Sequence, residues 1–183
     1  RFVQSQFQRQ FSALRRETTA ARIELIGDVP IFVAHDSVEV WADREQFLLH
    51  SDGSLQVQAG VPPDYFSRTG QLWGNPLYNW PRMEAGGFAF WKTRIARAAQ
   101  LFDRVRIDHF RGFAAHWEIP GLAKTAEHGR WVPAPGAALF STLTTDPQTR
   151  GVRFIAEDLG ILTPDVEELR DRFALPGIRV LQF

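Results

Sequence analysis

Apolar residues along this chain follow two patterns, a helical spacing and short continuous runs. The helical spacing predicts an amphipathic helix over residues 2–20, a second over 88–101, a weaker one around 137–143, and a last one that opens at Thr163-Pro164-Asp165 and ends near Phe173. Thr163 suits the N-cap of that last helix, and Pro164 suits its first position. The continuous apolar runs predict buried strands within residues 23–33, 105–107, 152–156 and 178–183.

The order of these elements indicates an α/β fold. Alternating helices and buried apolar strands are typical of a parallel sheet, either doubly wound or part of an eight-stranded barrel. The sequence has no Gly-x-Gly-x-x-Gly or phosphate-loop lysine motif. Two stretches without periodicity, 38–85 and 112–135, follow strand ends as long excursions. We therefore expect a partial (β/α)8 TIM barrel with about four parallel strands and long inserted loops.

Composition and charge exclude several classes of protein. The 183 residues are 44% hydrophobic, and 21 basic residues balance 21 acidic ones, so no net field attracts nucleic acid or an anionic membrane. The sequence contains no cysteine, which excludes disulfides and thiolate chemistry and fits the cytoplasm. No window approaches the roughly 18 apolar residues of a membrane span. The chain starts at Arg1 without a signal sequence or an initiator Met, so we expect a piece excised from a longer protein.

Two of the predicted strands end in a carboxylate that is soon followed by glycine. These segments are Arg104-Val105-Arg106-Ile107-Asp108-His109-Phe110-Arg111-Gly112 and Arg153-Phe154-Ile155-Ala156-Glu157-Asp158-Leu159-Gly160. Barrel enzymes place catalytic acids at strand ends in this way, and a pair of carboxylates suggests glycoside chemistry. In addition, six Trp and 15 Phe are more than a core of this size requires, so some rings should face a ligand.

Alternation along the first of these strands places Arg106 and Asp108 on the same face. The guanidinium favours the ionised carboxylate that a nucleophile requires. Asp28, at the end of an earlier strand, could orient the same guanidinium. Arg106 and Asp108 could equally form a buried ion pair that has no reaction to catalyse, and the pattern alone leaves both interpretations open.

Glu157 and Asp158 compete for the role of general acid. Glu157 follows an apolar run, so we expect its carboxyl to emerge from surroundings of low dielectric, which favour the protonated form that an acid catalyst needs. Asp158 is one residue further on and should point to the opposite face, towards the helices. We therefore assign the acid to Glu157 and a structural role to Asp158.

Six ordered motifs connect the chain to a known family. They are Gly27-Asp28-Val29-Pro30-Ile31-Phe32-Val33-Ala34-His35-Asp36-Ser37, Gly60-Val61-Pro62-Pro63-Asp64-Tyr65-Phe66-Ser67, Gly70-Gln71-Leu72-Trp73-Gly74-Asn75-Pro76-Leu77-Tyr78, Arg106-Ile107-Asp108-His109-Phe110-Arg111-Gly112, Gly129-Arg130-Trp131-Val132 and Ala156-Glu157-Asp158-Leu159-Gly160. Together they closely resemble the amylomaltases, the 4-alpha-glucanotransferases of glycoside hydrolase family 77, nearly from end to end. Six motifs at compatible spacing are specific, although each alone would not be.

The resemblance implies a fold, an activity and catalytic roles. The fold would be a barrel related to the alpha-amylases, of which residues 1–183 form a central fragment and 38–85 an inserted subdomain over the cleft. Asp108 would be the nucleophile and Glu157 the acid/base of a retaining enzyme that disproportionates maltooligosaccharides and other alpha-1,4-glucans. An alpha-glucan hydrolase of the amylase type and a non-catalytic glucan-binding fragment remain alternatives.

The resemblance also indicates where the sugar binds. Trp73 corresponds to a sugar-stacking residue of the family, and a flat indole matches the apolar face of a pyranose. Asp64, Tyr65 and Asn75 could bond the sugar hydroxyls, and His109 is expected near the donor sugar. Alternatively, Trp73 only cements a loop. The other histidines are scattered without metal-site spacing, so we predict no metal and no cofactor.

The sequence departs from the family at one catalytic position. Family members carry a third catalytic carboxylate in a His-Asp-Asn motif that lies beyond the strand ending at Phe183, and this chain stops before it. We therefore expect the 183-residue fragment to be inactive by itself.

Overall fold

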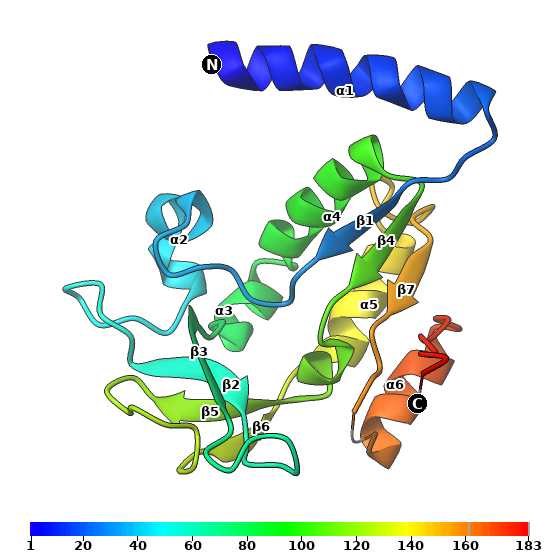
Figure 1. Ribbon diagram of the computed structural model, residues 1–183. Coiled ribbons are helices and arrows are strands. Elements are labelled where there is room, and N and C mark those ends of the chain that lie inside the picture. The colour runs from blue at the N-terminus through cyan, green and yellow to red at the C-terminus, as the bar shows by residue number, and fades with distance from the viewer. Residues whose placement is uncertain (161, 183) are drawn as a thin grey trace.

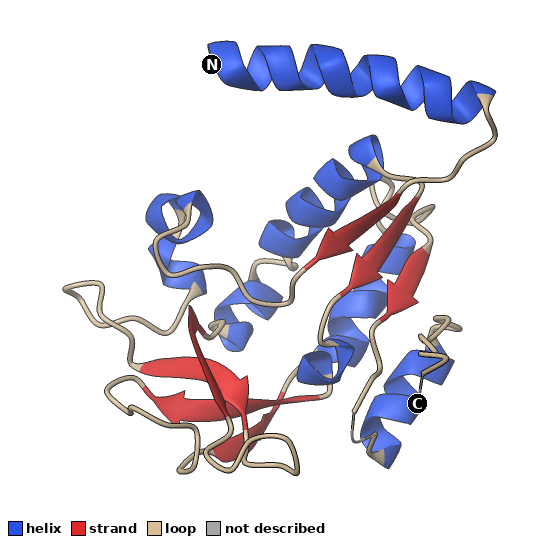
Figure 2. Ribbon diagram, viewed as in Figure 1, coloured by secondary structure: helices blue, strands red, loops and turns tan. Residues whose placement is uncertain are grey.

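The computed structural model describes residues 1–160 and 162–182, which form two sheets and the helices around them (Figures 1 and 2). The first sheet is parallel and consists of β1 (Ile26–Val29), β4 (Arg104–Ile107) and β7 (Phe154–Ala156), in the order β1-β4-β7. All three strands lie within predicted apolar runs. Because they are parallel, their carboxyl ends lie at the same edge of the sheet.

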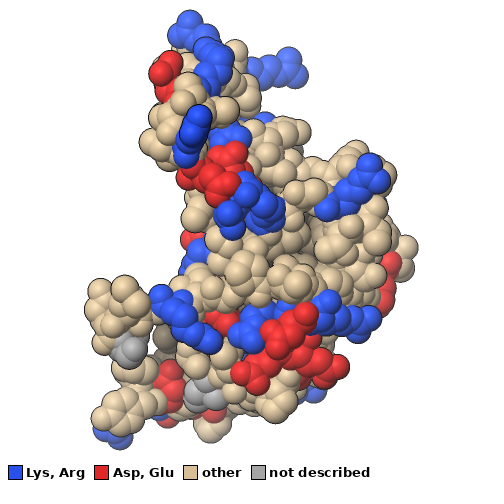
Figure 3. Space-filling model, turned by 90° about the vertical axis from the view of Figure 1, so that its right-hand side faces the viewer, with Lys and Arg blue, Asp and Glu red and all other residues tan. Residues whose placement is uncertain are grey.

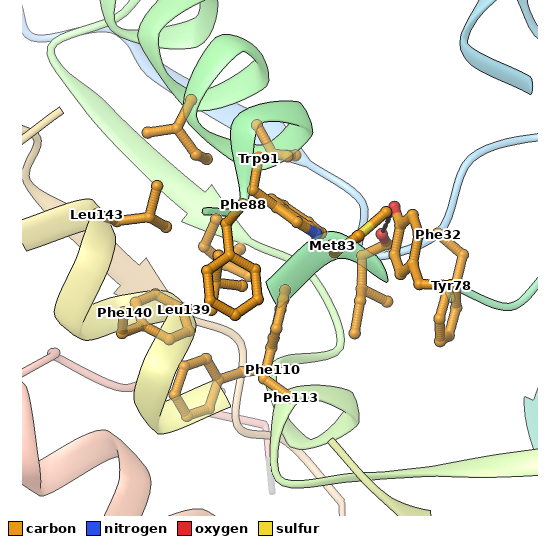
Figure 4. Packing of buried hydrophobic residues seen from close by; sticks show 14 of the residues in the cluster. Phe32, Tyr78, Met83, Phe88, Trp91, Phe110, Phe113, Leu139, Phe140 and Leu143 are labelled. Carbon is orange, nitrogen blue, oxygen red and sulfur yellow. Dashed lines mark hydrogen bonds between the residues drawn. The ribbon is translucent and has the colours of Figure 1, made fainter. Parts of the chain in front are cut away.

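Alternation along these strands separates a buried face from an open one. Val105, Ile107 and Ala156 are 1% exposed or less and face the helices α4 (Ala89–Leu101) and α5 (Gly136–Thr145). Figure 4 shows how rings from the short helix η2 (Phe110–Phe113) continue this core towards α5, with Phe110 and Phe113 beside Phe140. The opposite face of the sheet carries polar side chains and the 58% exposed Ile26.

The second sheet is antiparallel and contains four strands that we did not predict. They are β2 (Val57–Val61), β3 (Gln71–Pro76), β5 (Ala115–Pro120) and β6 (Arg130–Pro133), in the order β3-β2-β5-β6. The stretch 112–135, which we expected to be irregular, therefore supplies two strands that complete a sheet begun within 38–85. The prediction failed because such pairing depends on segments about 60 residues apart, and the buried polar Gln58 breaks the local pattern: its amide donates to the carbonyls of Pro120 and Gly121.

Of the remaining helices, α1 (Phe2–Ala20) and α6 (Pro164–Arg172) begin and end close to the predicted residues. The short helices α2 (Val38–Ala42), η1 (Arg44–Gln46) and α3 (Trp80–Ala85) lie within 38–85, where no helix was predicted. α1 lies apart from the other elements in Figure 1 and buries none of its residues; it is tied to the sheet by an ion pair between Arg15 and Asp103 and by the ring contact of Phe11 with Phe102. None of the helices in the described part of the chain combines the length and apolar character needed to cross a bilayer.

The predicted fourth parallel strand, 178–183, is not formed by residues 178–182, and Phe183 lies outside the described residues. The N–H of Ala156 donates to the carbonyl of Pro176, but the N–H of Ile178 donates to the carboxylate of Asp158 at 2.8 Å. A side chain therefore takes the hydrogen bond that would have continued a strand. The described sheet has three parallel strands rather than four.

Candidate functional site

Three charged side chains form a linked group at the carboxyl edge of the parallel sheet. Asp28 and Arg106 are paired in the strand register, and the Arg106 guanidinium lies 2.6 Å from a carboxylate oxygen of Asp28 and 2.8 Å from one of Asp108. Burial disfavours the charge of Arg106, but the bonds and the attraction from both carboxylates outweigh it and raise the pKa of Arg106. One guanidinium thus holds both carboxylates, as alternation along β4 predicted.

The register also brings Glu157 level with Asp108. Arg106 of β4 pairs with Ile155 of β7, and each carboxylate follows two residues later. Main-chain bonds maintain this alignment beyond the strands, because Glu157 donates its N–H to Ile107 and accepts one from Phe110. Two residues further along parallel strands the side chains return to the same face, so Asp108 and Glu157 lie at adjacent strand ends on the open face.

The surroundings of the Glu157 carboxyl are polar rather than apolar as we expected. One of its oxygens accepts the N–H of His109 at 2.9 Å, and the other accepts the N–H of Leu159 at 3.0 Å. The prediction failed because the chain turns immediately after both strands, which frees main-chain N–H groups to meet the carboxylate.

Asp158 points away from this site, as alternation predicts. It is 3% exposed and accepts hydrogen bonds from Arg170 of α6 at 2.7 Å and from the N–H of Ile178 at 2.8 Å. Burial alone would raise its pKa, but these donors outweigh burial and hold the pKa of Asp158 below its ordinary value. The side chain ties β7 to α6 and to the following segment.

A pocket of about 430 Å³ opens between the strand ends and the antiparallel sheet. Its walls come from the loop after β2, from β3 and β6, from η2 and its N-cap, and from the segment between β7 and α6. The lining residues are Val61, Pro62, Pro63, Asp64, Gln71, Trp73, His109, Arg111, Trp131, Leu159, Gly160 and Thr163. The pocket therefore adjoins the carboxylate pair, because its lining includes His109, directly after Asp108, and Leu159, two residues after Glu157.

Two predicted residues, Trp73 and His109, meet inside this pocket. Their rings lie edge to face with centroids 4.8 Å apart, and the indole N–H of Trp73 donates to Gln71 at 3.0 Å. Burial lowers the pKa of His109 to about 4; Asp108 opposes this shift and Arg111 adds to it. The imidazole is therefore neutral near pH 7.

The other predicted sugar contacts are placed differently. Asp64 lines the pocket, but one of its oxygens accepts the N–H groups of Phe66 and Ser67 and so holds its own loop. Tyr65 is 98% exposed and is not among the lining residues. Asn75 donates from its amide to the carbonyl of Val33 at 2.8 Å and also lies outside the pocket lining.

Arg111, Trp131 and Thr163 line the pocket and were not predicted as site residues from the sequence. The Arg111 guanidinium lies 4.0 Å from the ring centroid of Trp131 and donates to the Thr163 hydroxyl at 3.2 Å, and its buried Nε has no partner among the described residues. Burial lowers the pKa of Arg111, which Asp165 partly offsets. Arg111 and Trp131 both stand within the motifs quoted above, and that position was the available signal.

Figure 3 shows acidic and basic side chains interspersed around α6 and below α1 on the face that it presents. In residues 1–160 and 162–182 no three His, Asp or Glu side chains gather in a group that could hold a metal ion.

The sequence model of a family described as 4-alpha-glucanotransferase matches residues 1–183. The chain is 57% identical over 183 residues to the 4-alpha-glucanotransferase of Thermus thermophilus and 49% identical over 176 residues to that of a Synechocystis strain. These matches cover 100% and 96% of this chain, respectively. It spans only 36% and 35% of the length of these relatives.

One solved structure is similar to almost the whole of this chain. The amylomaltase from Streptococcus agalactiae in complex with acarbose superposes with a TM-score of 0.92 at 42% identity, over 97% of this chain and 35% of that one.

Proposed function

Because the chain belongs to the 4-alpha-glucanotransferases of glycoside hydrolase family 77, we propose that it carries the nucleophile and the acid/base of a retaining enzyme that disproportionates alpha-1,4-linked maltooligosaccharides. The observation that carries the proposal is the placement of Asp108 and Glu157 at adjacent parallel strand ends beside one pocket. Two carboxylates on either side of a glycosidic bond are what this chemistry requires. Retention requires a carboxyl separation of about 5–5.5 Å.

We propose further that the three-stranded sheet is part of a (β/α)8 barrel. Its helices α4 and α5 cover one face, and the other face carries Arg106 and the exposed Ile26, as the lumen side of an incomplete barrel would. Residues 38–85 would then belong to an excursion that lies over the cleft, since Asp64 and Trp73 reach the pocket from this segment.

Each catalytic residue would have a distinct task. Asp108, paired with Arg106, attacks the anomeric carbon while Glu157 gives its proton to the glycosidic oxygen, so that a glycosyl-enzyme forms and the shortened sugar leaves. Glu157, now a carboxylate, then takes the proton from the 4-hydroxyl of an acceptor sugar, which attacks the anomeric carbon and frees Asp108. Two inversions restore the alpha configuration.

Substrate recognition would come from the aromatic wall of the pocket. Trp73 can stack on a pyranose, and Asp64 and His109 present polar groups to its hydroxyls from the pocket lining. Arg106 and Asp28 would meet the sugar at the neighbouring strand ends rather than in the pocket lining. Tyr65 and Asn75 also lie outside the lining of this pocket, and their contact with the sugar stays a prediction. Acarbose occupies the similar amylomaltase from Streptococcus agalactiae, and this supports an alpha-glucan as the ligand.

Incubation of the full-length protein with maltotriose tests the proposal. Transfer produces glucose together with maltotetraose and longer chains, whereas products restricted to maltose and glucose would assign the hydrolase instead. Binding of maltotriose without turnover would reduce the protein to a glucan-binding module. The anomeric configuration of the first product, followed by NMR, checks retention.

A further inference from the structure

His109 has a backbone conformation that is uncommon for residues other than glycine. Its φ of 50° and ψ of 50° lie in the left-handed region, where a Cβ atom is crowded by the backbone. Strain of this kind in a residue other than glycine persists only where surrounding structure enforces it, and it concentrates at functional sites. At this strained residue the N–H donates to Oε2 of Glu157 at 2.9 Å.

We propose, on the basis of the glucanotransferase function above, that the strained main chain of His109 is a positioning device for Glu157. The N–H in question belongs to the peptide that joins Asp108 to His109. A single rigid peptide unit therefore carries the nucleophile on one side and the hydrogen bond to the acid/base on the other. This unit fixes the two carboxyl groups relative to each other across neighbouring strands.

The second N–H that binds the Glu157 carboxyl, that of Leu159, cannot fix Glu157 relative to Asp108. Leu159 binds the other oxygen at 3.0 Å, but it follows Glu157 by two residues in the same segment and holds the carboxyl only to its own loop. The bond from His109 is the one that spans from the end of β4 to the end of β7.

The structure holds the strained residue from all sides. Asp108 donates its N–H to Val29, Phe110 donates to Glu157, and Gly112 donates to the carbonyl of His109 itself. The imidazole packs against Trp73 on one side, and on the other a Cβ at Gly112 would approach it to 3.2 Å. The neighbouring residues therefore offset the strain and keep the N–H on its target.

Two variants of similar size separate the main chain from the imidazole. His109→Asn and His109→Val both remove the ring and its contact with Trp73, but Asn tolerates the left-handed region and β-branched Val does not. If the conformation positions Glu157, the kcat of His109→Val for maltotriose falls about 10- to 100-fold below that of His109→Asn, in the range of a misplaced general acid. KM should differ by less than about threefold, since the pocket changes equally in both.

A glycosyl donor whose leaving group needs no proton distinguishes a misplaced Glu157 from a general structural defect. Fluoride leaves maltotriosyl fluoride without a proton, and azide accepts the glycosyl group without a base, so Glu157 is bypassed in both steps. With this pair of reagents the gap between the two variants should close to less than about threefold. Equal turnover of maltotriose by the two variants, or an equal gap with both donors, would overturn the proposal.

Controls keep these outcomes distinct. Arg22 has a φ of 56° in an exposed turn after α1, so Arg22→Asn and Arg22→Val impose the same contrast away from the site and should leave kcat unchanged. Should His109→Val fail to fold, His109→Gly and His109→Ala repeat the comparison with a milder penalty, and Gly should be the faster of the two. An unsubstituted protein that turns over no glucan would refute the proposed function, whereas equal Asn and Val variants of an active enzyme refute only this inference.

Discussion

The two sheets on either side of the pocket differ in how their polar groups are satisfied. At the ends of the parallel strands Asp28, Arg106 and Asp108 bind one another, and main-chain N–H groups hold Glu157. On the antiparallel side the pocket presents rings, and Arg111 faces them without a carboxylate partner within ion-pair distance in the described residues. The comparison teaches that fixed geometry is concentrated where bonds would be broken, while the opposite wall offers surface that a sugar can cover.

The largest effect should come from the parallel edge. Asp108→Asn removes the nucleophile but keeps its shape, so turnover of maltotriose should fall by about a thousandfold or more while maltotriose affinity changes by less than about threefold. Steady-state kinetics and calorimetric titration measure the two quantities. Near-normal rates would remove Asp108 from the mechanism.

A matched control, Asp103, lies at the opposite edge of the same sheet, directly before β4. Asp103 binds Arg15 and the N–H of Leu25, which hold the pKa of Asp103 at about 2. Asp103→Asn should therefore lower the melting temperature and leave kcat unchanged. If Asp103→Asn lost as much turnover as Asp108→Asn, both variants would be acting by destabilising the folded protein, and the effect at Asp108 would not show a nucleophile.

Acid should destabilise the protein in part through the antiparallel sheet, because its strand β5 buries a histidine. His116 is 2% exposed, and burial lowers its pKa from 6.5 to about 4, with Glu118 acting in the opposite direction. Between these values the unfolded chain binds a proton that the folded protein does not. The contribution of His116 to the free energy of unfolding is therefore fully present above pH 6.5. Between pH 6.5 and about 4 it falls by about 1.4 kcal/mol for each unit of decreasing pH.

The free energy of unfolding at pH 7 and at pH 4.5, from urea titrations, checks this sign. His116→Leu should lose about 2–3 kcal/mol less between the two pH values than the unsubstituted protein. His128→Leu, at an exposed position, should behave like the unsubstituted protein. Identical pH dependence in the protein and in His116→Leu would contradict the assignment.

A smaller effect is expected from the aromatic wall of the pocket. Trp73→Ala removes the ring proposed to stack on a pyranose and should weaken maltotriose binding about tenfold, since aromatic stacking contributes about 0.5–1.5 kcal/mol. Trp41→Ala, on the 80% exposed Trp41 of α2, provides the control and should leave affinity unchanged. Unchanged affinity in Trp73→Ala with a lower melting temperature would show that Trp73 only cements its loop.

The smallest effect is expected at Arg111, which contacts Trp131 on one wall of the pocket and Thr163 on another. Arg111→Met removes the hydrogen bond to Thr163 and the cation over Trp131, so KM for maltotriose should rise about three- to tenfold with less change in kcat. Arg172→Met, which removes a cation over Phe173 outside the pocket lining, is the matched control. Equal kinetics of the two variants would exclude Arg111 from substrate binding.

The predicted helices and parallel strands depended on local patterns, and this is why they could be located. Apolar spacing placed α1 and α4 within a residue or two, and Thr163-Pro164 marked the start of α6 correctly. The side chain of Thr163 does not cap that helix, however, because Arg111 donates to it instead. The antiparallel sheet could not be located, since its pairing joins distant segments and buries the amide of Gln58.

The same division applies to the site. Alternation was enough to place Asp28, Arg106 and Asp108 together, because two of them share one strand and the register supplies the third. The N–H of His109 that binds Glu157 stands at a left-handed turn, which no sequence pattern encodes. Tyr65 and Asn75 have suitable chemistry, but their contacts follow from loop packing. Their roles, the subdomain 38–85 and the cytoplasmic location stay predictions.

The central claim is that Asp108 and Glu157 act on the same glycosidic bond, and covalent trapping tests it most directly. A 5-fluoro-maltosyl fluoride forms the glycosyl-enzyme faster than an acceptor can release it, and mass spectrometry of the digested protein then identifies the labelled residue. The account predicts a glycosyl ester on Asp108, formed equally fast in Glu157→Gln because fluoride needs no acid. A label on Asp28 or Glu157, or turnover of the reagent without any label, would contradict it.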